Sequence, residues 1–139
     1  SQWGVTYAMD AGSMGITVAY ASASDGSNND QSSAGVTVTA GDAKVVVATN
    51  KKTASSVTHT ATSVGASYAV SDTLSVQAYT GTTDKSDVAA YEVKDTGIGL
   101  TYTITPGLSL SITSNDFSGK GGTNAESGTR TNIALDATF

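Results

Sequence analysis

Few side chains in this sequence could take part in acid–base, nucleophilic or metal chemistry. His59 is the only histidine, so no histidine-based metal cluster can form within the chain. The run Gly119–Gly122 is rich in glycine, but it lacks the Gly-Lys-Ser/Thr order of a phosphate-binding loop, and we interpret it as a flexible loop. We therefore expect no catalytic residues, no metal site and no cofactor, and the chain is predicted not to be an enzyme.

A second group of polar residues could act on ions rather than on covalent bonds. Lys44, Arg130 and Asp136 are charged residues within segments that are otherwise poor in charge. Fixed charges on a water-facing surface bias the movement of ions along it. The alternative is that these three side chains pair with each other or with their neighbours. Which of these two interpretations holds depends on the secondary-structure elements that carry the three residues.

The composition limits what those elements can be. Thr, Ser, Ala, Val and Gly dominate, while Leu, Ile and Phe are scarce, and the net charge is -5. An acidic chain without clustered Lys or Arg is a poor ligand for nucleic acid, so we expect no nucleic-acid partner. No apolar stretch approaches the roughly 18 residues of a membrane helix, but a membrane strand needs only about 9 to 11 residues, apolar on one face.

Apolar and small or polar residues alternate along almost the whole chain. For example, Leu100 and Tyr102 alternate with Gly99 and Thr101. This period of two is typical of strands, and no segment keeps the helical period. We therefore predict an all-β chain, a single β-barrel region over residues 1–139, with antiparallel strands that each have one apolar face. The nine predicted strands are 1–9, 14–22, 34–41, 43–51, 59–70, 73–81, 96–105, 107–115 and 130–139.

The connections between these strands alternate in length. The short ones, at 10–13, 41–42, 71–73 and 105–107, have the Gly, Asp, Ser and Pro residues of tight turns. Longer connections rich in Ser, Asn, Asp and Gly are expected at 23–33, 52–58, 82–95 and 116–129. A meander with short turns at one end and long loops at the other is typical of outer-membrane barrels.

The last strand carries the most specific motif. The chain ends in Phe139, and alternate positions before it are Ala137, Leu135 and Ile133. This resembles the C-terminal signature of bacterial outer-membrane barrels, a terminal aromatic residue preceded by alternating apolar positions. The sequence departs from it at Ala137, where a bulkier residue is commoner. The resemblance is to the bacterial outer-membrane porin family, and it implies an outer membrane of a Gram-negative bacterium, a homotrimer, and recognition of this strand by the barrel-assembly machinery.

Aromatic residues on the apolar faces support this resemblance. Tyr7, Tyr68 and Tyr102 come shortly before short turns, and Phe139 is level with them at the chain end, whereas Trp3 and Tyr20 lie farther from the turns. Aromatic residues at one height form girdles at the interface between membrane and water. Tyr7, Tyr68, Tyr102 and Phe139 are therefore predicted to form one girdle, and Trp3 and Tyr20 are assigned to the opposite girdle. The alternative is that all six are ordinary strand aromatic residues of a soluble sandwich.

The direction of the strands indicates that the chain is the C-terminal part of a larger barrel. The first and last predicted strands both run toward the short turns, whereas a complete barrel of this family begins and ends on the same side and has an even number of strands. In a 16-stranded porin, this chain would supply roughly the last nine. The alternative is that the first segment does not span the membrane, which leaves an eight-stranded barrel.

The resemblance implies a channel for the passive diffusion of ions and small hydrophilic solutes. Small uncharged polar residues suit a water-facing wall better than a packed interior. On the polar faces, the residues predicted to line the pore are Lys44, Gln77, Tyr79, Arg130, Asn132 and Asp136. The competing hypothesis is a structural or adhesive β-protein of the cell surface without a channel, in which apolar faces would pack on each other.

Overall fold

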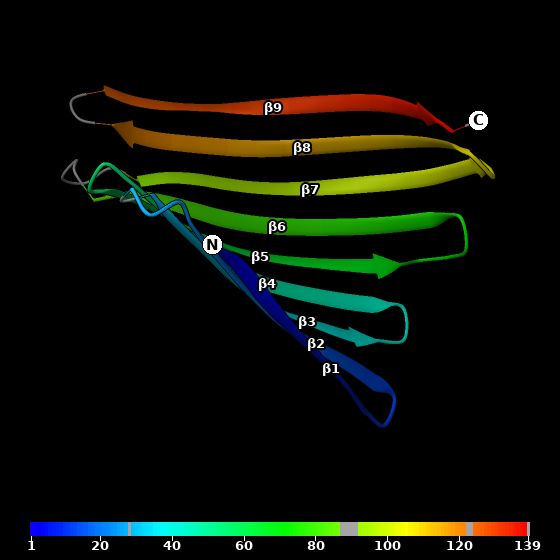
Figure 1. The fold of residues 1–139 in the computed structure, drawn as a ribbon. Helices are drawn as coiled ribbons and strands as arrows, with labels where there is room; N and C mark the ends of the chain where they lie inside the picture. Colours follow the sequence, from blue (N-terminus) through cyan, green and yellow to red (C-terminus); the bar gives the residue numbers. More distant parts are fainter. Residues whose placement is uncertain (28, 87–91, 122–123, 139) are drawn as a thin grey trace.

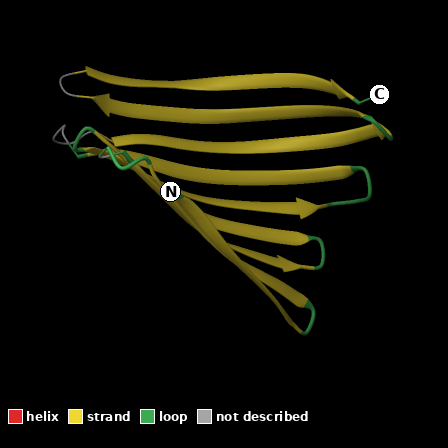
Figure 2. Ribbon diagram, in the orientation of Figure 1, coloured by secondary structure: helices red, strands yellow, loops and turns green. Residues whose placement is uncertain are grey.

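The computed structural model describes residues 1–27, 29–86, 92–121 and 124–138. They form one sheet of nine antiparallel strands, in which each strand is hydrogen-bonded to the strands before and after it in the chain. The sheet is a plain meander with no crossover, as Figures 1 and 2 show. The all-β, up-and-down prediction is confirmed.

All nine predicted strands are present. In chain order, they are β1 (Gln2–Ala11), β2 (Met14–Ser24), β3 (Asp30–Ala40), β4 (Ala43–Ala54), β5 (Val57–Ala69), β6 (Leu74–Lys85), β7 (Glu92–Thr105), β8 (Leu108–Gly121) and β9 (Asn124–Ala137).

The strands are longer than predicted, and the long loops are correspondingly shorter. Most of the segments expected to be loops, 23–33, 52–58, 82–95 and 116–129, belong to strands, so this prediction was wrong. The connection between β4 and β5 is a two-residue turn at Ser55 and Ser56, whose φ angles are 49° and 69°. Positive φ at both central residues is the geometry of a tight hairpin turn. The Ser- and Thr-rich segments continue the ladder because backbone pairing does not require apolar side chains.

The short turns at the other end of the sheet are level at first and then reach farther toward β9. Met14 pairs with Ala40, so the first two of these turns end level with each other. Ala43 pairs with Tyr68, and β5 continues beyond this row to Ala69. Leu74 pairs with Tyr102, and β7 continues to Thr105. Figure 1 shows the turns stepping outward along the sheet.

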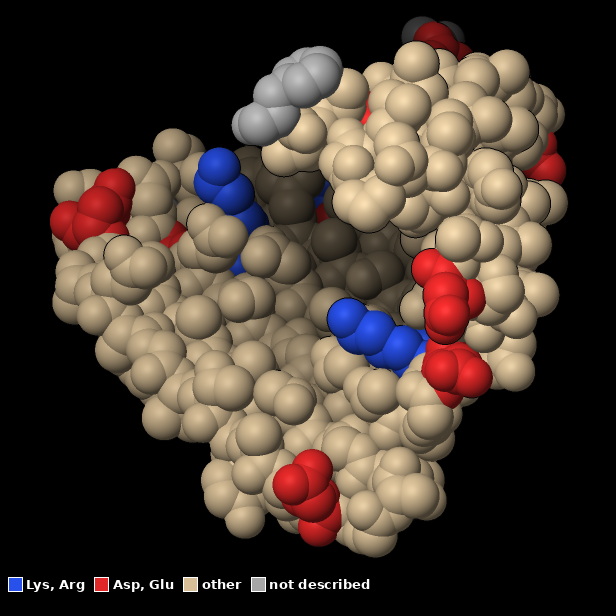
Figure 3. Space-filling model, turned by 90° about the vertical axis from the view of Figure 1, so that its right-hand side faces the viewer, with Lys and Arg blue, Asp and Glu red and all other residues tan. Residues whose placement is uncertain are grey.

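The sheet is a single layer without a core. Among the described residues no apolar side chain is buried, and Val5, Ile98 and Leu135 are 62%, 66% and 64% exposed. Figure 3 looks along the strands from the side of the short turns and shows the layer curled around a hollow. The described residues include no helix that is long and apolar enough to cross a membrane. Since side chains alternate between the two faces of a strand, the curl gives the sheet a concave and a convex face.

The two faces differ in chemistry. Each strand presents to the convex face about three or four consecutive alternate apolar residues, counted from its short turn. In β8, for example, Leu108, Leu110 and Ile112 are followed on this face by Ser114 and Asp116. At about 3.3 Å per residue, four alternate positions span roughly 20–26 Å along the strand, close to the height of a barrel's apolar band.

Candidate functional site: the concave face of the sheet

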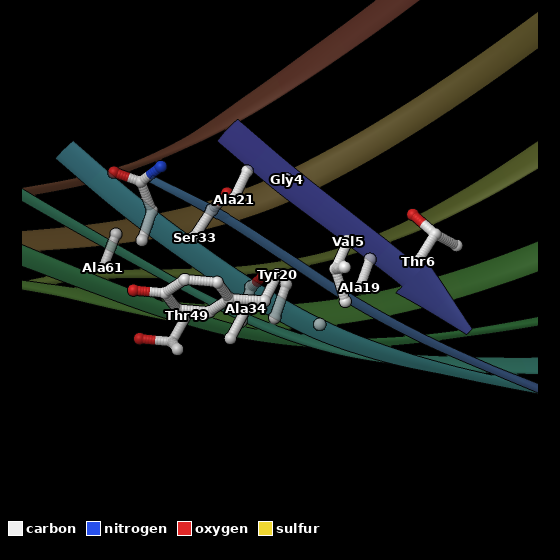
Figure 4. Close-up of a pocket in the computed structure, with 14 residues that line it drawn as sticks. Gly4, Val5, Thr6, Ala19, Tyr20, Ala21, Ser33, Ala34, Thr49 and Ala61 are labelled. Carbon is white, nitrogen blue, oxygen red and sulfur yellow. The ribbon is translucent and has the colours of Figure 1, made fainter. Parts of the chain in front are cut away.

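Small side chains line the concave face of β1–β5. A hollow of about 470 Å³ lies against these strands. Figure 4 shows Ala21, Ser33 and Ala61 on one side of the strands and Tyr20, Ala34 and Thr49 on the other. Glycine and alanine permit the curl, because side chains on the inner face of a bend crowd one another. A Cβ at Gly35 would lie 3.4 Å from the carbonyl oxygen of Val47, at the close end of ordinary contact.

All six residues predicted to line a pore project from the concave face. Cross-strand pairing places Lys44, Gln77 and Asn132 in one continuous row, through Ser67, Gly99 and Thr113. Tyr79 and Arg130 lie in the adjacent row, with Gly97 and Asn115 between them.

Asp136 pairs with Ser109 nearer the end of β9. The alternation of side chains, which fixes which face a residue takes, is thus maintained through these strands.

A polar cluster lies on the concave face of β6, β7 and β8. The hydroxyl of Tyr79 donates to the carboxylate of Asp95 over 3.5 Å, and the side-chain amide of Asn115 donates to the same oxygen over 3.0 Å. Three neighbouring strands thereby contribute to one group. The bond from Asn115 has good length, whereas the contact with Tyr79 is at the outer limit for a hydrogen bond.

Arg130 extends the cluster to β9. Its guanidinium carbon lies 5.9 Å from the centroid of the Phe117 ring, within the range of a cation–π contact. Within the described part of the chain, no ion pair joins Arg130 or Lys44 to an acid; a pair between Lys94 and Glu92, at 2.9 Å, lies on the convex face. Both basic groups therefore keep their charge available to water and solutes.

Several long side chains on the concave face lie across glycines of the next strand. A Cβ at Gly99 would meet the amide nitrogen of Gln77 at 2.7 Å, and one at Gly128 would meet the Phe117 ring at 3.0 Å. The glycines provide the space in which Gln77 and Phe117 lie along the wall instead of standing upright from it.

Three members of this surface were not identified from the sequence. Asp95 and Phe117 fell in segments interpreted as loops, and Asn115 was placed in a strand without a role. The signal was present, because Asp95 precedes Gly97 by two residues and Phe117 follows Asn115 by two, so the alternation that fixes the face simply continues.

The aromatic residues of the predicted girdle lie on the convex face where the structure describes them. Trp3 and Tyr20 form a tilted pair with ring centroids 5.2 Å apart, toward the long-loop end of β1 and β2. Tyr68 and Tyr102 lie near the short-turn ends of β5 and β7. Tyr7 lies four residues before the end of β1, because that strand continues through Ala11.

The C-terminal strand presents its alternate apolar residues to the same convex face. Ile133 and Leu135 are 67% and 64% exposed, and Ala137 ends β9. Phe139, predicted for both the girdle and the assembly signal, lies outside the described residues.

The described side chains of this surface offer little support for a catalytic or metal-binding site. His59 pairs across the strands with Lys52 and Lys85, so neither cross-strand neighbour is a carboxylate or a hydroxyl that could form a catalytic pair with it. Over the described ranges, no three His, Cys, Asp or Glu side chains gather closely enough to hold a metal ion. What the concave face offers is a water-accessible wall with hydrogen-bonding groups and separated charges.

Comparisons with known proteins agree with this architecture. The chain matches the family model of the Gram-negative porins over residues 1–127. It is similar in fold to the anion-selective porin from Comamonas acidovorans, with a TM-score of 0.67 and 15% identity, covering 99% of this chain and 49% of that one. It is also similar to outer-membrane expressed OmpT of Vibrio cholerae, with a TM-score of 0.62 and 13% identity, covering 96% of this chain and 64% of that one. No match was found among curated proteins.

Proposed function

The chain belongs to the Gram-negative porin family and to the outer membrane, and from this premise we propose that its concave face is part of the wall of a water-filled channel for the passive diffusion of ions and small hydrophilic solutes. The observation that carries the proposal is the distribution of side chains over a single layer. The large apolar residues face outward from the curve without a second layer to cover them, as Ile98 and Leu135 do. The inner face carries small and polar residues. Lipid outside and water inside satisfy both faces.

Closure of the channel needs partners for both edges of the sheet. In this meander β1 and β9 run in the same direction, so an antiparallel barrel closes only through an odd number of further strands. About seven would give a barrel of about sixteen, a size that leaves an aqueous lumen. Unpaired edges would each expose backbone groups to lipid at a cost of several kcal/mol per group. The chain spans 49% of the first porin to which it is similar, which is consistent with a partial barrel.

Six residues are proposed to contribute to the passage itself. Lys44 and Arg130 supply positive charge, Asp136 supplies negative charge, and Gln77, Tyr79 and Asn132 supply hydrogen-bonding groups. The absence of ion pairs at Lys44 and Arg130 in the described structure supports a field across the lumen over mutual pairing. The convex aromatic residues Trp3, Tyr7, Tyr20, Tyr68 and Tyr102 are proposed to form the girdles, together with Phe139.

Assembly is proposed to follow the family pattern. Ile133, Leu135, Ala137 and Phe139 would present the C-terminal signal to the barrel-assembly machinery, and three copies would associate. We propose no enzymatic activity, since His59, the sole histidine of the chain, has lysines as its cross-strand neighbours. The competing idea of a soluble structural or adhesive protein requires a second layer over the apolar face, and the described sheet has none.

Planar-bilayer recording tests the channel. The protein purified from outer membranes is expected to produce discrete, ohmic conductance steps and to require detergent for solubility. Absence of such steps, or a protein that stays soluble and monodisperse without detergent, would exclude the channel and favour the structural alternative.

A further inference from the structure

Gly97 is buried beneath the side chain of Tyr79 on the concave face. A Cβ at Gly97 would lie 2.5 Å from Cε1, 2.6 Å from Cζ and 2.7 Å from the hydroxyl oxygen of Tyr79. These contacts are too close for any side chain, so the phenol occupies the space that a residue other than glycine would fill. All three atoms belong to the far end of the tyrosine, which can move without displacing the backbone.

A second open space lies on the other side of Tyr79. Gly65 and Gly97 are its two cross-strand partners, one on each neighbouring strand. A Cβ at Gly65 would be 3.7 Å from its nearest neighbours, an ordinary contact. A hollow of about 210 Å³ extends over Gly65, lined by Lys44, Val46, Gln77 and Tyr79 among others. The phenol therefore has room to lie against the wall on either side of its own strand.

Little holds the phenol in the first of these positions. Among the described residues, its hydrogen bond there is the 3.5 Å contact with Asp95, at the limit of a useful length. Asp95 also keeps the shorter bond from Asn115 when the phenol leaves. Exchange between two wall positions would thus cost little in hydrogen bonding.

We propose that Tyr79 has two resting positions on the wall, over Gly97 and over Gly65, and that these two glycines fix the free width of the passage by keeping the phenol out of it. The inference rests on the proposed channel. It makes Gly65 and Gly97 size-determining residues although neither has a side chain to contact a solute. Movement of the phenol to Gly65 would also uncover the carboxylate of Asp95 to passing cations.

Alanine substitutions at the two glycines test the proposal in planar bilayers, with protein purified from outer membranes. Gly65→Ala should leave the step conductance unchanged, because its Cβ fits beside Tyr79. Gly97→Ala should also leave it unchanged, because the phenol moves over Gly65. The double variant closes both positions and forces the phenol into the lumen, so a loss of step conductance is expected.

Addition of Tyr79→Ala to the double variant is the matched control, and it should restore at least the original step. A double variant with the original conductance, or a triple variant that fails to recover, would overturn the inference. A loss already in Gly97→Ala alone would disprove the second resting position. Steps absent from the unmodified protein would overturn the channel and this inference together, whereas equal steps in all variants would overturn the inference only.

Discussion

Asn115 donates a 3.0 Å hydrogen bond to the carboxylate of Asp95 across the β7–β8 pair. The bond holds a negative charge against the concave wall. Asp116, the residue after Asn115, faces the opposite way, and the hydroxyl of Thr129 donates to its carboxylate over 2.5 Å. Two acids close together in the sheet thus lie on different faces, so Asp116 can serve as a control for the role of Asp95 in the proposed channel.

Asp95→Asn is expected to shift ion selectivity toward anions, because it removes a negative charge from the proposed lumen wall while the amide keeps the shape. Asp116→Asn should leave selectivity unchanged. The measurement is the reversal potential in a salt gradient across a planar bilayer. Equal shifts in the two variants would show that the concave face does not line the ion path.

Ile112→Arg is expected to lower the free energy of unfolding by up to about 2–4 kcal/mol, because the arginine would face lipid. Ile112 is 39% exposed on the convex face, with Leu100 and Ile133 as its cross-strand partners. Thr113→Arg places the same side chain on the concave face, where it meets water instead of lipid, and a smaller loss is expected. Denaturant unfolding in lipid vesicles measures both values, and a reversed order would contradict the assignment of the faces.

Gly107→Ala should destabilise the protein more than Gly41→Ala. Both glycines have positive φ, at 83° and 56°, which costs other residues about 1–2 kcal/mol. A Cβ at Gly107 would in addition lie 2.7 Å from the carbonyl oxygen of Thr138, whereas nothing lies within 4 Å at Gly41. The carbonyl of Gly107 also accepts a 2.7 Å hydrogen bond from the backbone N–H of Thr138, so the added methyl group would loosen the end of β9. Equal unfolding free energies of the two variants, measured side by side, would argue against this close contact between Gly107 and Thr138.

Asp25, in the connection between β2 and β3, should titrate below the usual range of an aspartate. The side-chain amide of Asn29 and then the backbone N–H of Ser27 donate to its carboxylate, at 2.7 Å and 2.8 Å, and lower its pKa. Because the folded value lies below the unfolded one, the stabilisation is present above the unfolded pKa and is lost as the pH falls through the folded value. Asn29→Ala should raise the pKa of Asp25, whereas Asn50→Ala on β4 should not. Carboxyl-carbon NMR titration checks this, and no change in Asn29→Ala would remove the amide as the cause.

Strand identity and face could be read from the sequence because the membrane imposes them residue by residue. Leu100 must face lipid and Gly99 must not, so the period of two survives in the amino-acid types. For the same reason, Lys44, Tyr79 and Arg130 could be assigned to the concave face without coordinates. Beyond the apolar band, both faces meet polar surroundings, and the alternation of apolar residues ends although the ladder continues. That is why Asp95 and Phe117 were interpreted as loop residues.

The contacts of Tyr79 could not have been predicted in the same way. Its face follows from alternation, but its position opposite Gly97 depends on the register between β6 and β7. In a meander the register is set by the lengths of the strands and their connections. Because the segment 82–95 was interpreted as a loop, the strand pairing that brings Tyr79, Asp95 and Asn115 together could not be predicted from the sequence.

The stepwise advance of the short turns, from the β1–β2 turn to the β7–β8 turn, means that the strands cross the barrel wall obliquely. A molecule travelling straight through would not follow any one strand. It would pass side chains from one tilted strand after another, so residues from different hairpins would be neighbours along its path. A substitution in one hairpin would then change the lining at one depth of the proposed channel and leave the lining above and below it unchanged.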